Sequence, residues 1–351
     1  MDYRQLGSSG LRVSALTLGT MTFGGQGNFA KVGSTDVATA RRQVDMCVDA
    51  GINLIDTADV YSRGASEEIV GEVLDGRRDE LLLATKVRMR MGDGPNMVGL
   101  SRHHVIEGCE ASLRRLRTDH IDLYQVHEWD GSVPLEETLS ALDQLVSDGK
   151  VRYVGVSNFA GWQLMKALGV SERHGLARFV SQQIYYSLQE RSAEYELIPA
   201  AADQGLGTLV WSPLAGGLLS GKYRRGEDAP EGSRRFAGWS EPPIYDEHKL
   251  YDTIEALVGV GETHDVSAAQ VALAWLLTRP TISSVIVGAR TDKQLADNLQ
   301  AASLTLSDAE LDRLERVSRP PLLYPYWHQM ATSADRLSPA DLSLIGPHLQ
   351  D

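Results

Sequence analysis

Apolar and polar positions alternate along this chain in two repeating patterns. Short apolar runs, such as 53–58, 81–87 and 121–127, have the length of buried strands, and longer amphipathic segments with helical spacing lie between them. Ser34, Thr35 and Asp36 precede one such helix, which ends at Ala50 before Gly51. The pattern predicts strands at 15–19, 53–58, 81–87, 121–127, 151–157, 179–185, 207–212 and 283–287, and further helices at 66–74, 101–116, 134–148, 161–173, 194–204, 267–279 and 291–301.

The order of these elements is a strand followed by a helix, repeated eight times. That alternation is typical of a parallel sheet, and eight units predict an α/β fold of the closed (β/α)8 TIM barrel type. Residues 3–13 predict an N-terminal β-hairpin, with Ser8, Ser9 and Gly10 in the turn, that closes the bottom of the barrel. We see no domain boundary, so we predict a single domain over residues 1–351.

Two segments depart from this alternation. Residues 214–245 form a long loop after the seventh strand, rich in Gly, Pro and Arg, and long loops in compact domains are usually functional or mobile. We interpret this loop either as a lid that clasps a phosphate or as a disordered surface loop. The C-terminal tail from Pro320 contains the aromatic run 322–328. Those aromatic side chains either fold over the barrel mouth as a substrate wall or pack against the outside of the barrel.

Composition and charge narrow the class of protein. The net charge of −13 argues against a nucleic-acid surface or an anionic membrane as partner. We find no apolar run of about 18 residues that would predict a membrane span. The two cysteines, Cys47 and Cys109, lie within predicted helices, and the chain opens without an apolar leader, so we expect a reduced cytoplasmic protein. The sequence leaves open whether the chain forms a homo-oligomer.

Polar side chains with acid–base chemistry lie at or just after the ends of three successive strands. These residues are Asp56, Tyr61, Lys86 and His127. Each alone has an ordinary structural interpretation, such as a helix cap or a satisfied core histidine. Because the carboxyl ends of barrel strands meet at one face, we instead expect the four to lie together.

Reduction of a carbonyl group would use all four residues. Tyr61 is a candidate proton donor, since a free phenol titrates near pH 10 and a nearby ammonium lowers that pKa. We expect Lys86 to be this ammonium and Asp56 to hold it in place. His127 would then orient the substrate oxygen by a hydrogen bond.

The segment 56–61 (DTADVY), followed by Lys86 and His127, resembles the catalytic tetrad of the aldo-keto reductases. Further segments resemble other motifs of that family, and the likeness extends from about residue 3 to residue 318. These segments are 18–25 (LGTMTFGG), 155–159 (GVSNF), 183–188 (QIYYSL), 211–216 (WSPLAG), 221–223 (GKY) and 288–298 (GARTDKQLADN).

The resemblance implies a nicotinamide cofactor and the residues that bind it. Ser157, Asn158 and Gln183 would hold the nicotinamide carboxamide, and Trp211 would stack on the ring. The other implied contacts lie in the first-strand loop, at the tetrad aspartate, in the seventh-strand loop and at the adenosine end: Thr20, Met21, Gln26, Asp56, Ser212, Pro213, Leu214, Ala215, Gly216, Lys222, Arg234, Gly288, Arg290, Gln294, Asp297 and Asn298.

The expected cofactor is NADPH. Its 2′-phosphate would be repelled by a chain of net charge −13 unless cations lie nearby, and Lys222, Arg234 and Arg290 are the candidates. No G-x-G-x-x-G follows a predicted strand, so a Rossmann site is not supported. His103 and His104 have no ligand-spaced partner, so we predict no metal site.

The leading hypothesis is an NADPH-dependent reductase of a small aldehyde or ketone. An alternative is a cofactor-sensing auxiliary subunit, because potassium-channel β subunits resemble this chain at W211-S-P-L and G221-K-Y. Those subunits carry asparagine at the position of His127, so the histidine favours an enzyme. A third hypothesis, a Schiff-base aldolase acting through Lys86, is opposed by the cofactor motifs. The sequence does not identify the substrate, although Arg88, Arg90, Trp129 and Trp239 lie in loops near the expected pocket.

Overall fold

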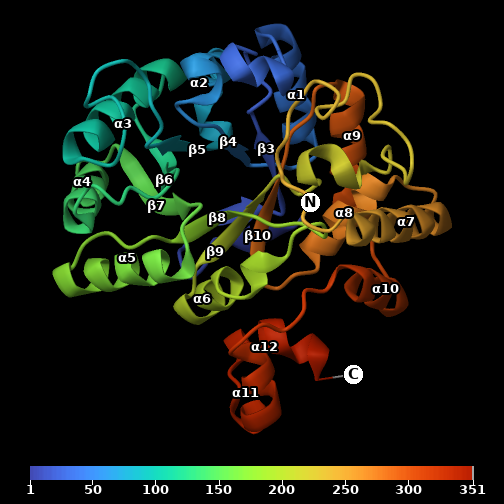
Figure 1. Cartoon of the computed structure of the whole chain (residues 1–351). Helices are drawn as coiled ribbons and strands as arrows, with labels where there is room; N and C mark the ends of the chain where they lie inside the picture. The colour runs from blue at the N-terminus through green and yellow to red at the C-terminus, as the bar shows by residue number, and fades with distance from the viewer. Residues whose placement is uncertain (350–351) are drawn as a thin grey trace.

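The computed structural model describes residues 1–349, and eight of its strands form a closed parallel barrel. The ring is seen nearly end-on in Figure 1. Its last strand pairs with its first, Val285 to Val287 lying opposite Leu16 to Leu18. The predicted TIM barrel is therefore confirmed. In order round the ring the strands are β3 (Leu16–Gly19), β4 (Leu54–Asp56), β5 (Leu82–Val87), β6 (Ile121–Val126), β7 (Val151–Ser157), β8 (Ser181–Tyr185), β9 (Gly207–Trp211) and β10 (Ile282–Val287).

The predicted hairpin consists of β1 (Tyr3–Gln5) and β2 (Arg12–Ser14), which pair antiparallel. Leu6 and Val13 are fully buried and join the apolar cluster inside the barrel, together with Leu54, Ala84, Leu123, Leu209 and Ile286. Gly7 lies so close to the backbone that a Cβ there would be 2.5 Å from the carbonyl oxygen of Gly205. The hairpin thus closes the amino-terminal end of the barrel and leaves the carboxyl ends of the strands as the open face.

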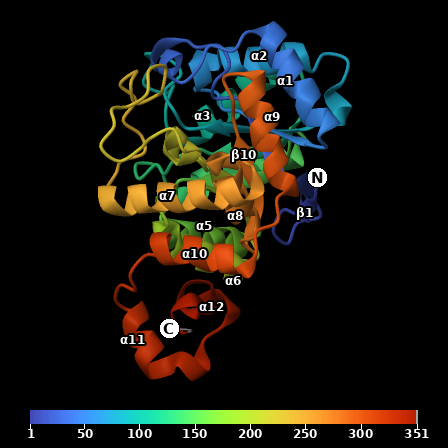
Figure 2. The ribbon, with the colours of Figure 1, turned by 90° about the vertical axis from the view of Figure 1, so that its right-hand side faces the viewer.

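Helices surround the ring and bury their apolar faces against the outer side of the strands (Figures 1 and 2). Side chains alternate along each strand, so that in β5 Leu83 and Val87 face these helices while Ala84 and Lys86 face the interior. The helices are α1 (Val37–Asp49), α2 (Ala65–Val73), α3 (Arg102–Leu116), α4 (Leu135–Ser147), α5 (Gly161–His174), α6 (Leu197–Gln204), α7 (Glu247–His264), α8 (Ala268–Leu277), α9 (Asp292–Gln300) and α10 (Asp308–Ser318).

Two of these helices were not predicted from the sequence pattern. Helix α7 begins after Asp246, whose side chain accepts a hydrogen bond from the N–H of Lys249, and it packs over the almost wholly buried α8. Helix α10 begins with a capping box between Ser307 and Glu310. Both start signals are present in the sequence, so the capping residues could have predicted the two helices.

The C-terminal tail packs against the outside of the barrel, which is the second of the two alternatives. It forms α11 (Tyr326–Ser333) and α12 (Pro339–Ile345), which lie beside α6 and apart from the ring of strands (Figures 1 and 2). The hydroxyl of Tyr326 donates to the carbonyl oxygen of Tyr195 at 2.6 Å and to Glu196 at 2.7 Å. The rings of Tyr195 and Tyr326 stack with centroids 5.7 Å apart.

Candidate active site

Lys86 is the centre of a buried polar cluster at the open end of the barrel. It is fully buried, and its Nζ donates to Asp56 Oδ2 at 2.7 Å, to the Thr57 carbonyl at 2.8 Å and to the Tyr61 hydroxyl at 3.4 Å. The interior position follows from strand alternation, because Asp56 and Lys86 are inward residues near the ends of adjacent strands β4 and β5. The structure thus brings together three of the four predicted residues.

Asp56 is fixed from the opposite side by two amides. Gln183 Nε2 donates to Asp56 Oδ1 at 2.7 Å, and Gln125 Nε2 donates to the same oxygen at 3.2 Å. Both carboxylate oxygens therefore have partners, and β4, β6 and β8 are connected across the barrel. Sequence reasoning missed Gln125, although it lies two residues before His127 on the same strand face and could have been found by that spacing.

His127, the fourth predicted residue, lies against Tyr61. Their ring centroids are 6.0 Å apart and the planes meet at 80°. Burial, together with the positive charges of Lys86 and Arg88, holds the pKa of His127 well below its usual range, so the imidazole is neutral at physiological pH. Its Nδ1 is buried without a hydrogen-bond partner in the described part of the chain. A neutral imidazole with a free ring nitrogen can bind a carbonyl oxygen as a donor in the appropriate tautomer.

Burial outweighs the expected lowering of the Tyr61 pKa by Lys86, so the net shift is upward. Burial raises the pKa of the phenol above its usual value, and Lys86 offsets only part of that increase. For Lys86 itself, burial lowers the pKa, but the attraction of Asp56 and Tyr61 outweighs burial and the net change is upward. Lys86 therefore stays protonated, and Tyr61 stays a neutral phenol able to donate its proton.

The residues predicted to bind the nicotinamide end of the cofactor lie beside this cluster and are fixed by hydrogen bonds. Ser157 donates to the carbonyl of Gln183 at 3.0 Å. Asn158 donates through Nδ2 to the His127 carbonyl at 3.1 Å and accepts from Trp211 Nε1 at 3.0 Å. The Trp211 ring also packs against Tyr185, with centroids 5.0 Å apart. The indole is therefore held in one orientation at the end of β9.

The predicted seventh-strand loop, 212–216, is a tight turn. Ser212 and Ala215 have φ of 50° each, and Ser212 Oγ accepts from the N–H of Gly216 at 3.0 Å. A Cβ on Gly216 would lie 2.9 Å from the carbonyl oxygen of Glu241, so the distal part of the 214–245 loop packs back onto this turn. The loop thus has a specific contact at the barrel mouth.

The three predicted phosphate-binding cations lie close to one another. Burial lowers the pKa of Arg234 to about 10, and repulsion by Arg290 adds to this decrease. Burial also lowers the pKa of Lys222, with repulsion from Arg290 and Arg234 contributing. None of the three forms an ion pair with a described carboxylate. Clustered cations without a counter-ion are a favourable place for a phosphate.

The remaining predicted residues occupy the first-strand loop and helix α9. Thr20 is buried and bonds to Ser66 at 2.8 Å, Gln26 follows in the same loop, and Met21 is half-buried there. Gln294 accepts from the N–H of Arg290 at 3.0 Å, and Asn298 is buried. Both carboxylate oxygens of Asp297 accept hydrogen bonds at 2.7 Å, from the side chains of Ser267 and Gln270 at the beginning of α8. Asp297 therefore has a structural role, and a cofactor would have to share these oxygens with it.

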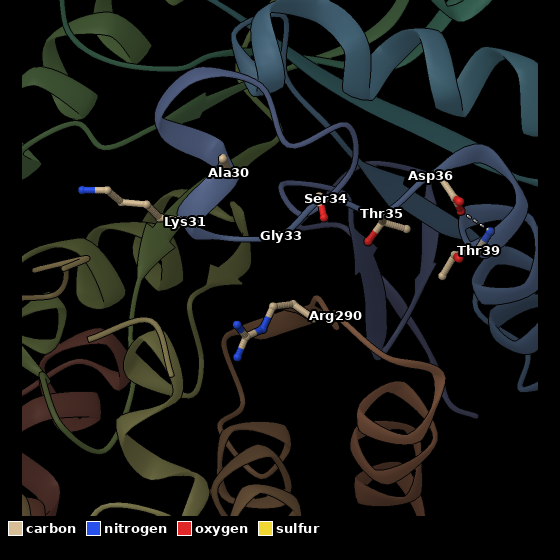
Figure 3. Close-up of a pocket in the computed structure, with 8 residues that line it drawn as sticks. All are labelled: Ala30, Lys31, Gly33, Ser34, Thr35, Asp36, Thr39 and Arg290. Atoms are coloured by element: carbon tan, nitrogen blue, oxygen red, sulfur yellow. Dashed lines mark hydrogen bonds between the residues drawn. The ribbon is translucent and has the colours of Figure 1, made fainter. Parts of the chain in front are cut away.

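A pocket of about 300 Å³ lies beside Arg290, between the loop at 30–36 and the end of β10. Figure 3 shows the hydroxyls of Ser34 and Thr35 facing Arg290 across this gap, with Lys31 directed away. Asp36, the cap of α1, also lines this pocket. Among residues 1–349 we find no group of three or more His, Cys, Asp or Glu side chains spaced to hold a metal ion, and no helix long and apolar enough to cross a membrane.

Comparison with known proteins agrees with this geometry. The sequence profile of the Aldo/keto reductase family matches residues 15–319. The chain belongs to the aldo/keto reductase family. A relative from Bacillus subtilis, named "Uncharacterized oxidoreductase YrpG", is 41% identical over 90% of this chain and 94% of its own. Two relatives named as potassium-channel β subunits, "probable" in Arabidopsis thaliana and "putative" in Schizosaccharomyces pombe, are 36% and 37% identical over 90% and 86% of this chain and 96% and 88% of theirs.

Membership of the aldo/keto reductase family assigns this chain to the oxidoreductases. The resemblance stated from the motifs is confirmed by the family match and by both kinds of relative.

Proposed function

We propose that the protein is an NADPH-dependent reductase that converts an aldehyde or ketone to the alcohol, with a small carbonyl compound as substrate and a cytoplasmic location. The observation that carries this proposal is the buried contact of Lys86 with both Asp56 and Tyr61. Burying charged groups costs free energy, and buried ionisable groups with shifted pKa values are concentrated at functional sites.

The residues at the barrel mouth fit a dinucleotide. Lys222, Arg234 and Arg290 repel one another, and none forms an ion pair with a described carboxylate, which suits the 2′-phosphate. Asn158 and Gln183 offer amide groups near Trp211 at the other end. When bound, NADPH would supply the hydride. The chain's own residues would hold it and leave the face opposite Trp211 open to substrate.

Tyr61 would protonate the carbonyl oxygen as the hydride arrives on carbon. The neutral phenol donates, and the adjacent Lys86 ammonium stabilises the phenolate that remains. Asp56 keeps Lys86 in place through the 2.7 Å ion pair, and neutral His127 orients the carbonyl oxygen. The proton returns to Tyr61 from solvent before the next turnover.

The test is steady-state reduction of a panel of aldehydes and ketones, followed by loss of absorbance of the reduced cofactor, with Tyr61→Phe as the key variant. Positioned acid catalysis contributes about 10² to 10⁴-fold, so the variant should lose that factor in turnover while binding the cofactor normally. Tyr324→Phe, in the exposed tail, is the matched control. Near-normal turnover by Tyr61→Phe would refute the assignment.

A second candidate is an auxiliary subunit with slow turnover, favoured by the relatives named as channel β subunits. The two functions separate in one measurement. An enzyme should complete many turnovers on a good aldehyde, whereas a sensor should hold cofactor tightly and complete few. The neutral, unpartnered imidazole of His127 supports the enzyme.

A further inference from the structure

Arg88 follows directly after β5, whose last inward-facing residue is Lys86 and which ends at Val87. The N–H of His127 donates to the carbonyl oxygen of Val87 at 2.9 Å, so the backbone of Arg88 begins beside His127 at the open end of the barrel. The charge of Arg88 acts on the imidazole of His127, so the guanidinium is near the reacting end of the site.

The backbone of Arg88 has a conformation that side chains rarely adopt. Its φ is 138°, and its carbonyl oxygen accepts from the N–H of Gly99 at 2.8 Å, which fixes the loop. Such conformations are strained for a residue with a side chain and cluster at functional sites. The residue is therefore held in place by its surroundings and not by its own preference.

The guanidinium of Arg88 has no hydrogen-bond partner among residues 1–349, and its Nε is fully shielded from solvent. The nearby Arg90 differs: it is exposed, and its Nη1 donates to the carbonyls of Gly92 and Gly94 within its own loop. Of the two arginines that the sequence suggested for the pocket, Arg88 is the one that is half-buried and forms no side-chain hydrogen bond to the described residues. An arginine fork with free donors matches the two oxygens of a carboxylate.

Two carboxylates, Glu128 and Asp130, lie near enough to Arg88 for its charge to favour their ionised forms. Neither forms an ion pair with Arg88 within 4.0 Å among the described residues. Asp130 instead accepts three hydrogen bonds, from the N–H and hydroxyl of Ser132 and from the N–H of Leu100. Burial raises the pKa of the half-buried Glu128 despite Arg88. The N–H donors of Arg88 are thus unpaired in the described site, although nearby carboxylates balance part of its charge.

We propose that Arg88 binds an acidic group of the substrate, so that the preferred substrates are aldehydes or ketones that also carry a carboxylate. This inference rests on the reductase function proposed above. The acidic group would lie further out than the carbonyl, with the carbonyl at Tyr61 and His127 and the carboxylate at Arg88. Arg88 would then determine specificity without taking part in proton or hydride transfer.

The experiment compares two substrates of nearly equal shape and electronics, para-carboxybenzaldehyde and its neutral amide, para-formylbenzamide. The wild type should show a kcat/KM about tenfold to hundredfold higher for the acid. Arg88→Met should abolish this preference by lowering kcat/KM for the acid far more than for the amide. Arg88→Lys should keep part of the preference, since a point charge replaces the fork. Arg90→Met is the matched control and should behave as wild type.

A binding measurement keeps the inference testable without turnover. Calorimetric titration with para-carboxybenzyl alcohol and with its amide should show tighter binding of the acid to the wild type, and equal binding to Arg88→Met. Equal kcat/KM for acid and amide in the wild type would overturn the role of Arg88 while leaving the reductase intact. Absence of any carbonyl reduction would instead refute the reductase, and equal binding of both alcohols would then refute Arg88 as well. Loss of both substrates in Arg88→Met and Arg88→Lys together would show a structural role only.

Discussion

Asp59 offers the sharpest test of the electrostatics beneath the site. It is 1% exposed, and neither carboxylate oxygen has a hydrogen-bond partner of good geometry among the described residues. Burial raises its pKa well above the usual value, and repulsion from Glu67 raises it further. The N–H of Val60 and the charges of Arg115 and Lys86 offset only part of this shift. The folded protein therefore keeps Asp59 protonated at a pH where the unfolded chain has released the proton.

The consequence for stability follows from proton linkage. Below about pH 3.9 the carboxyl is protonated in both states and adds no pH dependence. As pH rises above that value, the unfolded state gains by ionising and the folded state does not, so the free energy of unfolding falls by about 1.4 kcal/mol for each pH unit until the folded carboxyl itself ionises. Asp59→Asn has the same shape and no proton to lose, so it should escape this loss.

We therefore expect Asp59→Asn to match the wild type in acid and to become progressively more stable than it towards neutral pH. The measurement is urea unfolding of both proteins at several pH values, followed by circular dichroism. Asp79→Asn, at an exposed position, is the control and should differ from wild type by a constant amount. A constant gap for Asp59→Asn, or a gap that narrows as pH rises, would show that Asp59 is ionised in the folded protein and would refute the reasoning.

Three further predictions concern the site and the core. Lys86→Met should lower the free energy of unfolding by about 3–5 kcal/mol, because Asp56 is left buried without its cation. Alcohol oxidation by this variant should need a higher pH, because the Tyr61 pKa rises further, and an unchanged pH–rate profile would contradict this. Arg290→Ala should weaken binding of NADPH more than of NADH in fluorescence titrations, with the difference shrinking in high salt; equal loss for both would leave the 2′-phosphate to other cations. Cys47 and Cys109, whose pKa values burial raises to about 12, should not react with a thiol reagent at pH 8 until the protein unfolds; fast labelling of the native protein would disprove this.

Much of the fold was predictable because strand and helix periods are strong in this sequence. The predicted strand at 151–157 coincides with β7, and the others differ from the observed strands by a few residues at most. Helix α7 was not predicted, because its cap at Asp246 follows directly after a long loop that has no strand or helix spacing. The packing of the tail could not be predicted, since it depends on the contact of Tyr326 with Tyr195, which are far apart in the chain.

The site shows a similar division. Inward alternation on adjacent strands was enough to predict that Asp56 and Lys86 meet. The direction of the Tyr61 pKa was not predictable, because it depends on how far burial outweighs one ammonium, and burial is a property of the folded chain. The difference between Arg88 and Arg90 likewise arises from loop geometry and not from residue type.

Closure of the barrel has a consequence for how the protein is made. Strand β3 pairs with β4 on one side and with β10, the last strand of the barrel, on the other. Leu16 can therefore pair with Val285 only after the chain has been synthesised as far as β10. At about 5–20 residues per second, that wait lasts roughly 15 to 55 seconds. Throughout it the edge of β3 has unpaired N–H and C=O groups, and the inner hydroxyl of Thr17 lacks its bond to Ser284. Chains that end before β10 therefore leave this edge of β3 unpaired and open to pairing with another strand.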